Sequence, residues 1–332
     1  MTAAQTEMDA TAEPGDRCAA MLQRIADLDA EHAKSVAGGG EKYVARHRER
    51  NKFTARERIE LLIDPGSAFL ELSPLAGWGS DFTVGASVVT GIGVVKGVEC
   101  VITANDPTVK GGASNPWTLK KVLRAAKIAE NSLPTIALVE SGGGDLSTQK
   151  DIFIPGGQMF RDITRASARK ETSISLVFGI SIAVGAYIPA MSDYTVMVKE
   201  RAKVFLGGPP LVKMATGEES DDGSLGGAEM HARVSGLADY LAVDELDAIR
   251  IGRRIMARLN RHHSAKGVPQ IPAYAEPDED PESLFDLIPT DLKEPFGPRD
   301  VIARVADGAG PANEVAFDEF KPLYGARIRN GR

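Results

Sequence analysis

The sequence has very little cysteine: its 332 residues include only Cys18 and Cys100. Two thiols argue against a disulfide framework and are typical of a protein in a reducing compartment. The chain also lacks an apolar run of the roughly 18 residues that a membrane-spanning helix needs. Its polar, acidic N-terminus lacks the basic and then apolar order of a signal peptide. These absences predict a soluble, cytoplasmic protein that does not bind membranes.

An excess of positive charge is missing as well, because the formal net charge is −7 at pH 7. A negative balance argues against nucleic acid as a partner. The most densely charged stretch, residues 41–58, alternates basic with acidic residues. This favours a solvated helical face, although some of its arginines could meet phosphates. The pair His262–His263 favours a surface turn over a metal site, and we expect no metal.

Apolar residues recur at helical spacing in the N-terminal part of the chain. They include Met21, Leu22, Ile25 and Leu28. The pattern predicts helices from about residue 16 to residue 63, with a break at the three glycines 38–40. The residues before them, 1–16, are predicted to be disordered.

Beyond residue 66 the sequence alternates short β-rich runs with helical segments. This order predicts βαβ units in a layered α/β architecture. Strands are expected over 85–97, 98–106, 134–140 and 173–180, with two more short ones within 194–208. Helices are expected over 116–132, 158–169 and 244–260, and another begins within 179–193. The proline- and acid-rich segment 269–284 predicts a linker or an extended arm.

Two turns of small residues stand directly after apolar strands. The first comprises Ser141, Gly142, Gly143 and Gly144, and the second comprises Ala183, Val184, Gly185 and Ala186. Neither matches a dinucleotide or phosphate-loop motif, and residues 179–183 fail the G-x-S-x-G pattern at the last position. Small residues let a ligand approach the main chain, and a helix start leaves N–H groups unpaired, so the two turns could form an oxyanion hole. From the turns alone, tight turns in a packed core remain the favoured interpretation.

Four longer segments carry a resemblance to a known family. They are "ARERIELLIDPGSAFLELSPLAG", "TANDPTVKGGASNPWTLKKVLRAAKIAE", "PAMSDYTVMVKERAKVFLGGPPLVKMATGEE" and "LGGAEMHARVSGLADY". Together they resemble the carboxyltransferase (β) subunit of biotin-dependent acyl-CoA carboxylases, in the family's order, and the match runs from about residue 38 to residue 324. The resemblance implies a crotonase-like α/β fold with two related halves. Residues 208–219 and 226–236 are more similar to the 3-methylcrotonyl-CoA type than to the propionyl-CoA type.

The resemblance also implies a mechanism and a site. In this family the acyl-CoA becomes an enolate whose oxygen main-chain N–H groups stabilise, and biotin itself is thought to act as the base, so no catalytic side chain is required. On this sequence the expected catalytic donors are the N–H groups of Gly143, Gly144, Val184 and Gly185. The residues expected to contact acyl-CoA are Lys110, Gly111, Gly112, Ser141, Gly142, Ala183 and Ala186.

The interpretation of residues 110–112 comes from their chemistry. The two glycines permit close approach and Lys110 offers a compact charge, which suits the pantetheine or the phosphates of CoA. A structural turn explains these residues as well.

Two positions depart from the family pattern. Val184 stands where the family has glycine, and its side chain could narrow or block the acyl pocket, although its N–H remains available. Asp145 follows Gly144 where the family usually carries Arg, Tyr or Asn. An acid beside anionic CoA and a developing enolate is unfavourable unless it is paired.

The expected domains are a disordered N-terminus (1–16), an acyl-CoA carboxyltransferase N-terminal domain of crotonase-like fold (17–272), and a linker with the truncated start of the C-terminal carboxyltransferase domain (273–332). In the family a second half follows, which binds carboxybiotin. The expected partners are therefore a biotin carboxylase and biotin carrier subunit, with biotin attached to the carrier, and a C-terminal half or a full-length β subunit. A homo-oligomer is also expected.

Three functions stay open from the sequence. The first is a carboxyltransferase acting on a branched or unsaturated acyl-CoA. The second is a catalytically incomplete module that binds acyl-CoA or assembles with a full-length β subunit. The third is a hydratase-like enzyme, which would need a carboxylate aimed at the substrate, and Glu140 and Asp145 are the near candidates.

Overall fold

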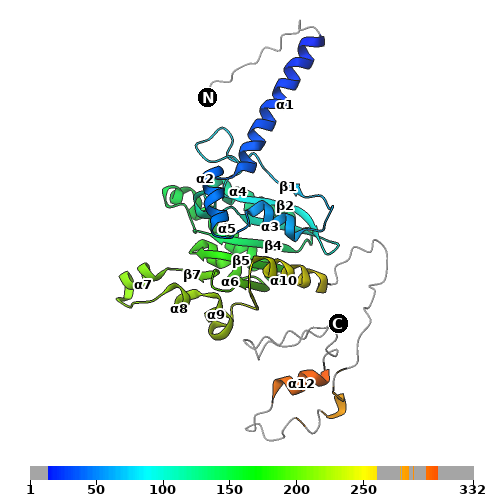
Figure 1. Cartoon of the computed structure of the whole chain (residues 1–332), viewed down its shortest axis with the longest axis vertical. Coiled ribbons are helices and arrows are strands. Elements are labelled where there is room, and N and C mark those ends of the chain that lie inside the picture. The colour runs from blue at the N-terminus through cyan, green and yellow to red at the C-terminus, as the bar shows by residue number, and fades with distance from the viewer. Residues whose placement is uncertain (1–13, 260–276, 278, 284–286, 288–296, 306–332) are drawn as a thin grey trace.

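The computed structural model describes residues 14–259, 277, 279–283, 287 and 297–305 (Figure 1). Within these residues eight strands form one mixed sheet, in the order β1-β2-β3-β4-β5-β6-β8 with β7 beside β5. The pairs β1–β2 and β2–β3 are antiparallel, and every pair from β3 onward is parallel. The strands are β1 Leu70–Glu71, β2 Val88–Val95, β3 Val98–Asn105, β4 Thr135–Ser141, β5 Ser173–Ile182, β6 Tyr194–Val198, β7 Lys203–Phe205 and β8 Tyr240–Ala242.

The helices are spread along the whole described chain. They are α1 Pro14–Ala37, α2 Glu41–Glu49, α3 Ala55–Leu62, α4 Pro116–Ala129, α5 Gln149–Ala168, α6 Val184–Ala190, α7 Pro209–Thr216, α8 Asp222–Gly226, α9 Ala228–Met230, α10 Glu245–Arg258 and α12 Pro298–Val305. No helix in this part of the chain is long and apolar enough to cross a membrane.

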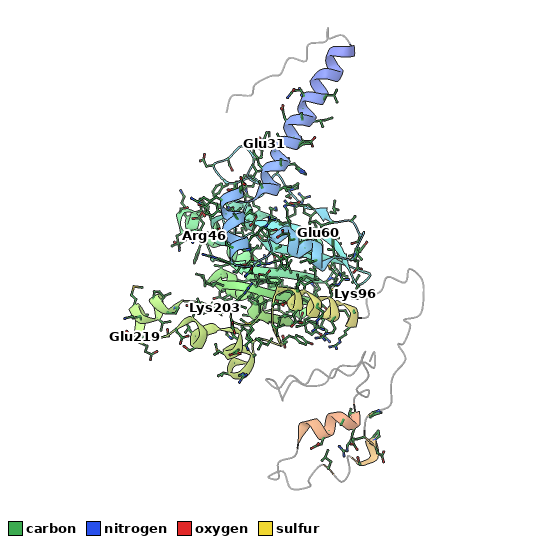
Figure 2. The ribbon with its side chains drawn as sticks, in the orientation of Figure 1. Glu31, Arg46, Glu60, Lys96, Lys203 and Glu219 are labelled. Carbon is green, nitrogen blue, oxygen red and sulfur yellow. The ribbon has the colours of Figure 1, made fainter. Side chains whose placement is uncertain are left out.

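Helices cover both faces of the sheet. Along β3, Ile102 belongs to the cluster that contains Ile59 of α3, whereas its neighbour Val101 packs with Ala125 of α4. Because successive side chains of a strand point to opposite faces, α3 and α4 lie on opposite sides. Helix α10 packs against α3, and α5 packs against α4. Side chains fill this layered body, while α1 with Glu31 and the segment with Glu219 project from it (Figure 2).

Side-chain caps start the helices that frame the sheet. Asn115 accepts hydrogen bonds from the second and third N–H groups of α4, and Pro116 occupies the first helical position, where its missing N–H costs nothing. Thr54 and Glu57 form a reciprocal capping box at the start of α3. Asp244 accepts from the N–H of Asp247 at 2.8 Å at the start of α10. The sequence therefore specifies these three starts locally.

The layered α/β architecture and its main elements are as predicted. The strands expected over 85–97 and 98–106 form an antiparallel hairpin that turns at Lys96 and Gly97, both of which have positive φ. The strands over 134–140 and 173–180 and the helices over 116–132 and 244–260 also form, with small shifts of their ends.

Three expectations differ from the structure or lie outside it. Helix α5 begins at Gln149 rather than at residue 158. Proline commonly interrupts a helix, but α5 continues through Pro155. Residues 14–16, expected to be disordered, belong to α1. Residues 1–13, the histidine pair at 262–263 and most of the expected arm at 269–284 lie outside the described residues.

Candidate functional site

The sheet brings the two small-residue turns together. Strands β4 and β5 are parallel neighbours, so their carboxyl ends meet at one edge, and Ser141 is paired in register with Ser181. A β-carbon placed on Gly143 would lie 3.1 Å from the carbonyl oxygen of Ile182 and 3.4 Å from the β-carbon of Ala183. The expected meeting of the turns is therefore observed, although their roles stay predictions.

The first turn is braced by the segment 110–112. Gly142 donates its N–H to the carbonyl oxygen of Gly111 at 2.9 Å, and the Ser141 hydroxyl donates to the carbonyl oxygen of Gly112 at 3.0 Å. A β-carbon on Gly112 would lie 2.4 Å from the carbonyl oxygen of Glu140. The structure thus places Lys110, Gly111 and Gly112 beside the site, and glycine at position 112 is required by this close approach.

The N–H groups of the four expected donors differ in their availability. Gly143 donates its N–H to the hydroxyl of Ser141 at 3.2 Å. Gly144, Val184 and Gly185 make no main-chain or side-chain donation of their N–H within the described residues. Val184 and Gly185 are free because they begin α6, where no preceding turn supplies an acceptor. Three N–H groups therefore remain for a ligand, and the fourth is already engaged.

Close packing holds the second turn against the first. Gly185 is buried, and a β-carbon there would lie 3.0 Å from Ser181 Oγ and 3.1 Å from Ser141 Oγ. Ala183 donates its N–H to the carbonyl oxygen of Phe205 at 3.2 Å and has a positive φ of 50°. Val184 is half-buried. Position 185 must stay small for α6 to sit on the end of β4.

The acid beside the site is paired. Lys110 donates to Asp145 Oδ2 at 2.9 Å. The hydroxyl of Ser147 and the ammonium of Lys110 hold the pKa of Asp145 below its ordinary value, so this carboxylate is charged at neutral pH. The pairing removes the isolated negative charge that the sequence raised as a difficulty, and it ties up Lys110 when no anion is bound.

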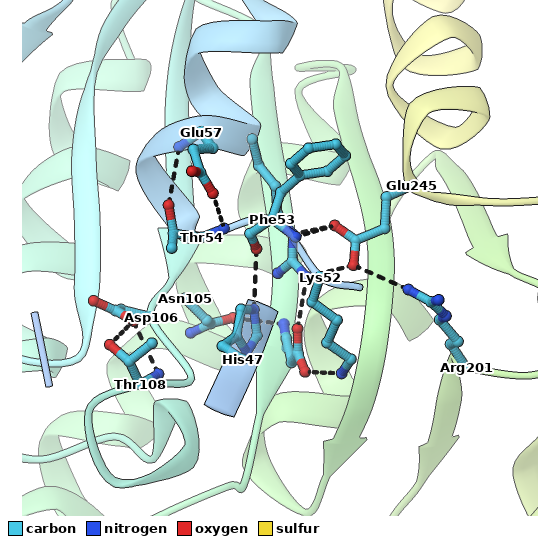
Figure 3. Close-up of polar contacts among 12 residues, drawn as sticks. His47, Lys52, Phe53, Thr54, Glu57, Asn105, Asp106, Thr108, Arg201 and Glu245 are labelled. Atoms are coloured by element: carbon cyan, nitrogen blue, oxygen red, sulfur yellow. Dashed lines mark hydrogen bonds and ion pairs between the residues drawn. The ribbon is translucent and has the colours of Figure 1, made fainter. Parts of the chain in front are cut away.

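Glu140 belongs to a charge cluster behind the first turn, which we define as Lys52, Arg58, Glu140, Arg201 and Glu245; Arg58, Glu140 and Glu245 are buried, and Lys52 and Arg201 are partly exposed (Figure 3). Arg58 donates to Glu140 Oε2 and to both carboxylate oxygens of Glu245, each at 2.9 Å. Lys52 donates to the other oxygen of Glu140.

The cluster rules Glu140 out as a proton-transfer group aimed at a ligand. Burial alone would raise the pKa of Glu140, but the charges of Arg58 and Lys52 outweigh burial and lower the pKa. A carboxyl group held ionised in this way is a poor acid at neutral pH. Its Oε1 also lies 2.6 Å from the place that a β-carbon of Gly179 would occupy, so the carboxylate lies over β5. The hydratase-like interpretation loses its first candidate.

This cluster was not predicted from the sequence, and one of its residues was assigned to an exposed helical face. The expected solvated face over residues 41–58 is wrong at its end, because the Arg58 side chain is 0% exposed. The signal was present: Arg58 shares a helical face with Ala55, Ile59 and Leu62, all of which are buried. A charged residue at a core position requires buried partners, and Glu140 and Glu245 are those partners.

Comparison with protein families places the chain among known proteins. Residues 46–332 match the model of the carboxyl transferase domain. A probable biotin-dependent acyl-coenzyme A carboxylase beta2 subunit of Mycobacterium tuberculosis is 64% identical over an alignment of 332 positions that covers 98% of this chain and 60% of that protein. A mitochondrial methylcrotonoyl-CoA carboxylase beta chain of Dictyostelium discoideum is 46% identical over an alignment of 325 positions that covers 96% of this chain and 54% of that protein. The chain thus spans little more than half the length of these curated relatives.

Solved structures agree with the sequence matches. The beta subunit of a geranyl-CoA carboxylase from P. aeruginosa superposes with a TM-score of 0.71 at 38% identity, covering 91% of this chain and 57% of that one. A transcarboxylase 12S hexamer with methylmalonyl-coenzyme A bound superposes with a TM-score of 0.70 at 28% identity, covering 86% of this chain and 57% of that one. The expected carboxyltransferase fold of the crotonase-like class is confirmed.

Proposed function

The chain belongs to the carboxyl transferase domain family, and from that premise we propose that it is the acyl-CoA-binding part of a biotin-dependent carboxyltransferase. Such an enzyme moves a carboxyl group from carboxybiotin to an acyl-CoA. The observation that carries the proposal is the meeting of the two turns, with three N–H groups that the chain itself leaves free. Two neighbouring sources of N–H groups are what a developing oxyanion needs.

The chain's own contribution is to hold the thioester oxygen. The N–H groups of Val184 and Gly185, with that of Gly144 opposite, would bind this oxygen more strongly as it gains charge. Each such donor is worth about 3 kcal/mol in the transition state. The acyl carbon that reacts, which is the α-carbon of a saturated acyl group or the γ-carbon of a 3-methylcrotonyl group, can then lose its proton to a base other than a protein carboxylate. Carboxybiotin, brought by the carrier subunit, would supply the carboxyl group and the basic atom.

A 3-methylcrotonyl-CoA-like substrate is the favoured acyl group. Identity is 46% to the Dictyostelium methylcrotonoyl-CoA carboxylase beta chain and 33% to a propionyl-CoA carboxylase beta chain of Saccharopolyspora erythraea. Lys110 would meet the pantetheine or the phosphates of CoA, with Asp145 as its partner until the ligand binds. Val184 would set the width of the acyl pocket from the floor of the site.

The remaining partners are proposals of the same kind. They are a biotin carboxylase and biotin carrier subunit, a C-terminal carboxyltransferase half or full-length β subunit, and further copies of this chain. The alignments cover only 60% and 54% of the two relatives, which supports the need for a second half. The boundaries 17–272 and 273–332 and a cytoplasmic location stay predictions.

Fixation of labelled bicarbonate tests the function. The full chain is mixed with biotin carboxylase, biotinylated carrier, ATP and 3-methylcrotonyl-CoA, with and without a supplied C-terminal half. Acid-stable label in the acyl-CoA is expected when both halves are present. Acyl-CoA binding without label in either mixture would favour the alternative, a catalytically incomplete binding or assembly partner. Absence of acyl-CoA binding would contradict both.

A further inference from the structure

The residue that turns β5 into α6 has an unusual backbone. Ala183 has φ 50° and ψ −122°, a region that residues with a β-carbon rarely adopt and that costs energy. Glycine would adopt it without this penalty. The alanine therefore needs a reason, and strain of this kind points to function when the surrounding site supports it.

The turn has the form of a nucleophile elbow. In such an elbow a strained strand-to-helix turn exposes a nucleophile between small residues two positions before and after it, and the next residue's N–H belongs to the oxyanion hole. Residues 181–185 read Ser-Ile-Ala-Val-Gly. In this frame Ala183 holds the place of the nucleophile and Val184 supplies the N–H. Residues 179–183, which fail the G-x-S-x-G pattern, begin two residues before the segment that forms the turn, 181–185.

Two further observations support a ligand at this turn. The Ser181 hydroxyl is fully buried, lies 3.0 Å from the place that a β-carbon of Gly185 would occupy, and has no hydrogen-bond partner among the described residues. A buried hydroxyl without a partner is costly, so the polar groups around this turn are not all used by the chain itself. The methyl group of Ala183 lies 3.4 Å from the point that a β-carbon of Gly143 would occupy, between the two turns.

We propose that Ala183 is a specificity-determining residue whose methyl group faces the carbonyl carbon of the bound acyl-CoA. The inference rests on the proposed function, because it takes the thioester oxygen to lie on the N–H of Val184. An alanine leaves the carbonyl polarised and offers no hydroxyl or thiol to attack it. The bond from the carbonyl carbon to sulfur therefore stays intact while the α- or γ-carbon of the acyl group reacts.

Adding a thiol to the β-carbon of residue 183 tests this placement. In Ala183→Cys the thiol would add to the carbonyl carbon, the carbon–sulfur bond to CoA would break, and CoA would leave as a thiol with the proton that the cysteine gives up. One acyl-cysteine and one free CoA form together. The probes are acetyl-CoA and isovaleryl-CoA, because a saturated acyl group offers the thiol no double bond.

The matched control is Ala190→Cys, at the exposed end of the same helix. The unmodified chain, with Cys18 and Cys100, gives the background. Intact mass spectrometry of the full chain should show acylation of the 183 variant about tenfold or more faster than of the 190 variant, because a bound thioester is held beside the thiol. Release of CoA should match the acyl group gained.

Equal rates at the two positions would overturn the inference. It would also be overturned by a thiol at 183 that a small alkylating reagent cannot reach in the folded protein. If the thiol disturbs folding, Ala183→Gly provides the second measurement: it should melt above the unmodified chain, because glycine relieves the strained φ. An equal or lower melting temperature would contradict a strained position. No carboxybiotin enters these assays, so their failure is distinct from a failure of carboxyl transfer.

Discussion

Residues 141–144 and 183–186 stand side by side at the ends of neighbouring parallel strands, yet their main chains are used differently. The first turn gives two of its N–H groups to the protein, one to Gly111 and one to Ser141. The second turn leaves the N–H groups of Val184 and Gly185 without a protein acceptor in the described chain. Both turns are partly braced, because the second also donates the N–H groups of Ala183 and Ala186 to carbonyl oxygens; within the described residues the first leaves one free N–H group, that of Gly144, and the second leaves two adjacent ones at the start of α6.

The two turns also differ in what holds them in place. The charge cluster lies behind the first turn and includes Glu140, the residue before Ser141. On its other side the turn is hydrogen-bonded to residues 110–112. The second is held by the contact of Gly185 with Ser141 and Ser181 and by the hydrogen bond from the Ala183 N–H to the carbonyl oxygen of Phe205. An oxyanion site gains from this arrangement, because donors fixed before the reaction need no reorganisation during it.

Breaking the brace of the first turn should have the largest effect. Arg58→Ala leaves the carboxylates of Glu140 and Glu245 buried without their shared cation. Loss of one partner from a buried ion pair costs about 3–5 kcal/mol, so the free energy of unfolding in urea should fall by about that amount.

Arg56→Ala is the matched control for Arg58→Ala. Arg56 lies two residues earlier on α3 and donates to Glu71 at 2.7 and 3.0 Å, but both side chains are partly exposed. An exposed pair contributes about 1 kcal/mol or less. Equal losses for the two variants would mean that the cluster does not support the fold.

Crowding the second turn should have the next largest effect. Gly185→Val puts a branched side chain where Ser181 and Ser141 are already about 3 Å away. Overpacking of this kind costs about 1–3 kcal/mol, and acyl-CoA binding should weaken because the bulk lies beside the donor. Titration with acyl-CoA, together with thermal melting, measures both effects.

Val184→Gly is the opposite change at the neighbouring residue. The half-buried valine side chain is removed from the floor of the site while the N–H remains. The fold should persist and acyl-CoA binding should improve or stay the same. If Gly185→Val binds like the unmodified chain at unchanged stability, the turn does not face the ligand and its small residues serve packing alone.

The difference between the turns could be predicted only in part from the sequence. Strand and helix periodicity located both turns, because each follows a run of apolar residues that forms a buried strand. The sequence could not show that Gly143 gives its N–H to Ser141, since this depends on the path of the main chain. It also gave no sign of the positive φ at Ala183, because alanine is not a residue that local rules place there.

Ion-pair partners that lie far apart in the chain were the second feature that could not be predicted from the sequence. Arg58 and Glu245 are 187 residues apart in the chain, so no local pattern links them. The helical spacing of Arg58 with Ala55, Ile59 and Leu62 shows that an arginine lies on the buried face of α3. Which carboxylates compensate it depends on the meeting of α3, β4 and α10, and that meeting is a property of the fold.

Removing the Ser141 hydroxyl should have a moderate effect on stability. Ser141→Ala takes away the acceptor of the Gly143 N–H and the donor to the carbonyl oxygen of Gly112. Loss of a buried hydrogen-bond partner costs about 1–3 kcal/mol. Acyl-CoA affinity should not fall, because the buried hydroxyl braces the turn and the N–H of Gly143 becomes available. A variant of unchanged stability that loses affinity would reverse these roles.

The smallest effect on stability is expected from Lys110→Glu. The Lys110 side chain is 62% exposed, so the fold should persist, and melting should change little. The new carboxylate would face Asp145 and the anionic CoA, so acyl-CoA affinity measured by calorimetry should fall, and added salt should reduce the difference. Lys110→Gln is the control that removes the charge without reversing it, and its affinity should lie between the two.

The pairing of Lys110 with Asp145 also predicts a pH dependence. The folded pKa of Asp145 is lowered from 3.8, so the stability that its charge contributes is present above pH 3.8 and is lost as the pH falls through the lower folded pKa. Stability measured between pH 5 and pH 3 should therefore fall less steeply in Lys110→Gln than in the unmodified chain. Identical slopes, together with unchanged acyl-CoA affinity in Lys110→Glu, would remove residues 110–112 from the ligand site and leave them as a structural brace.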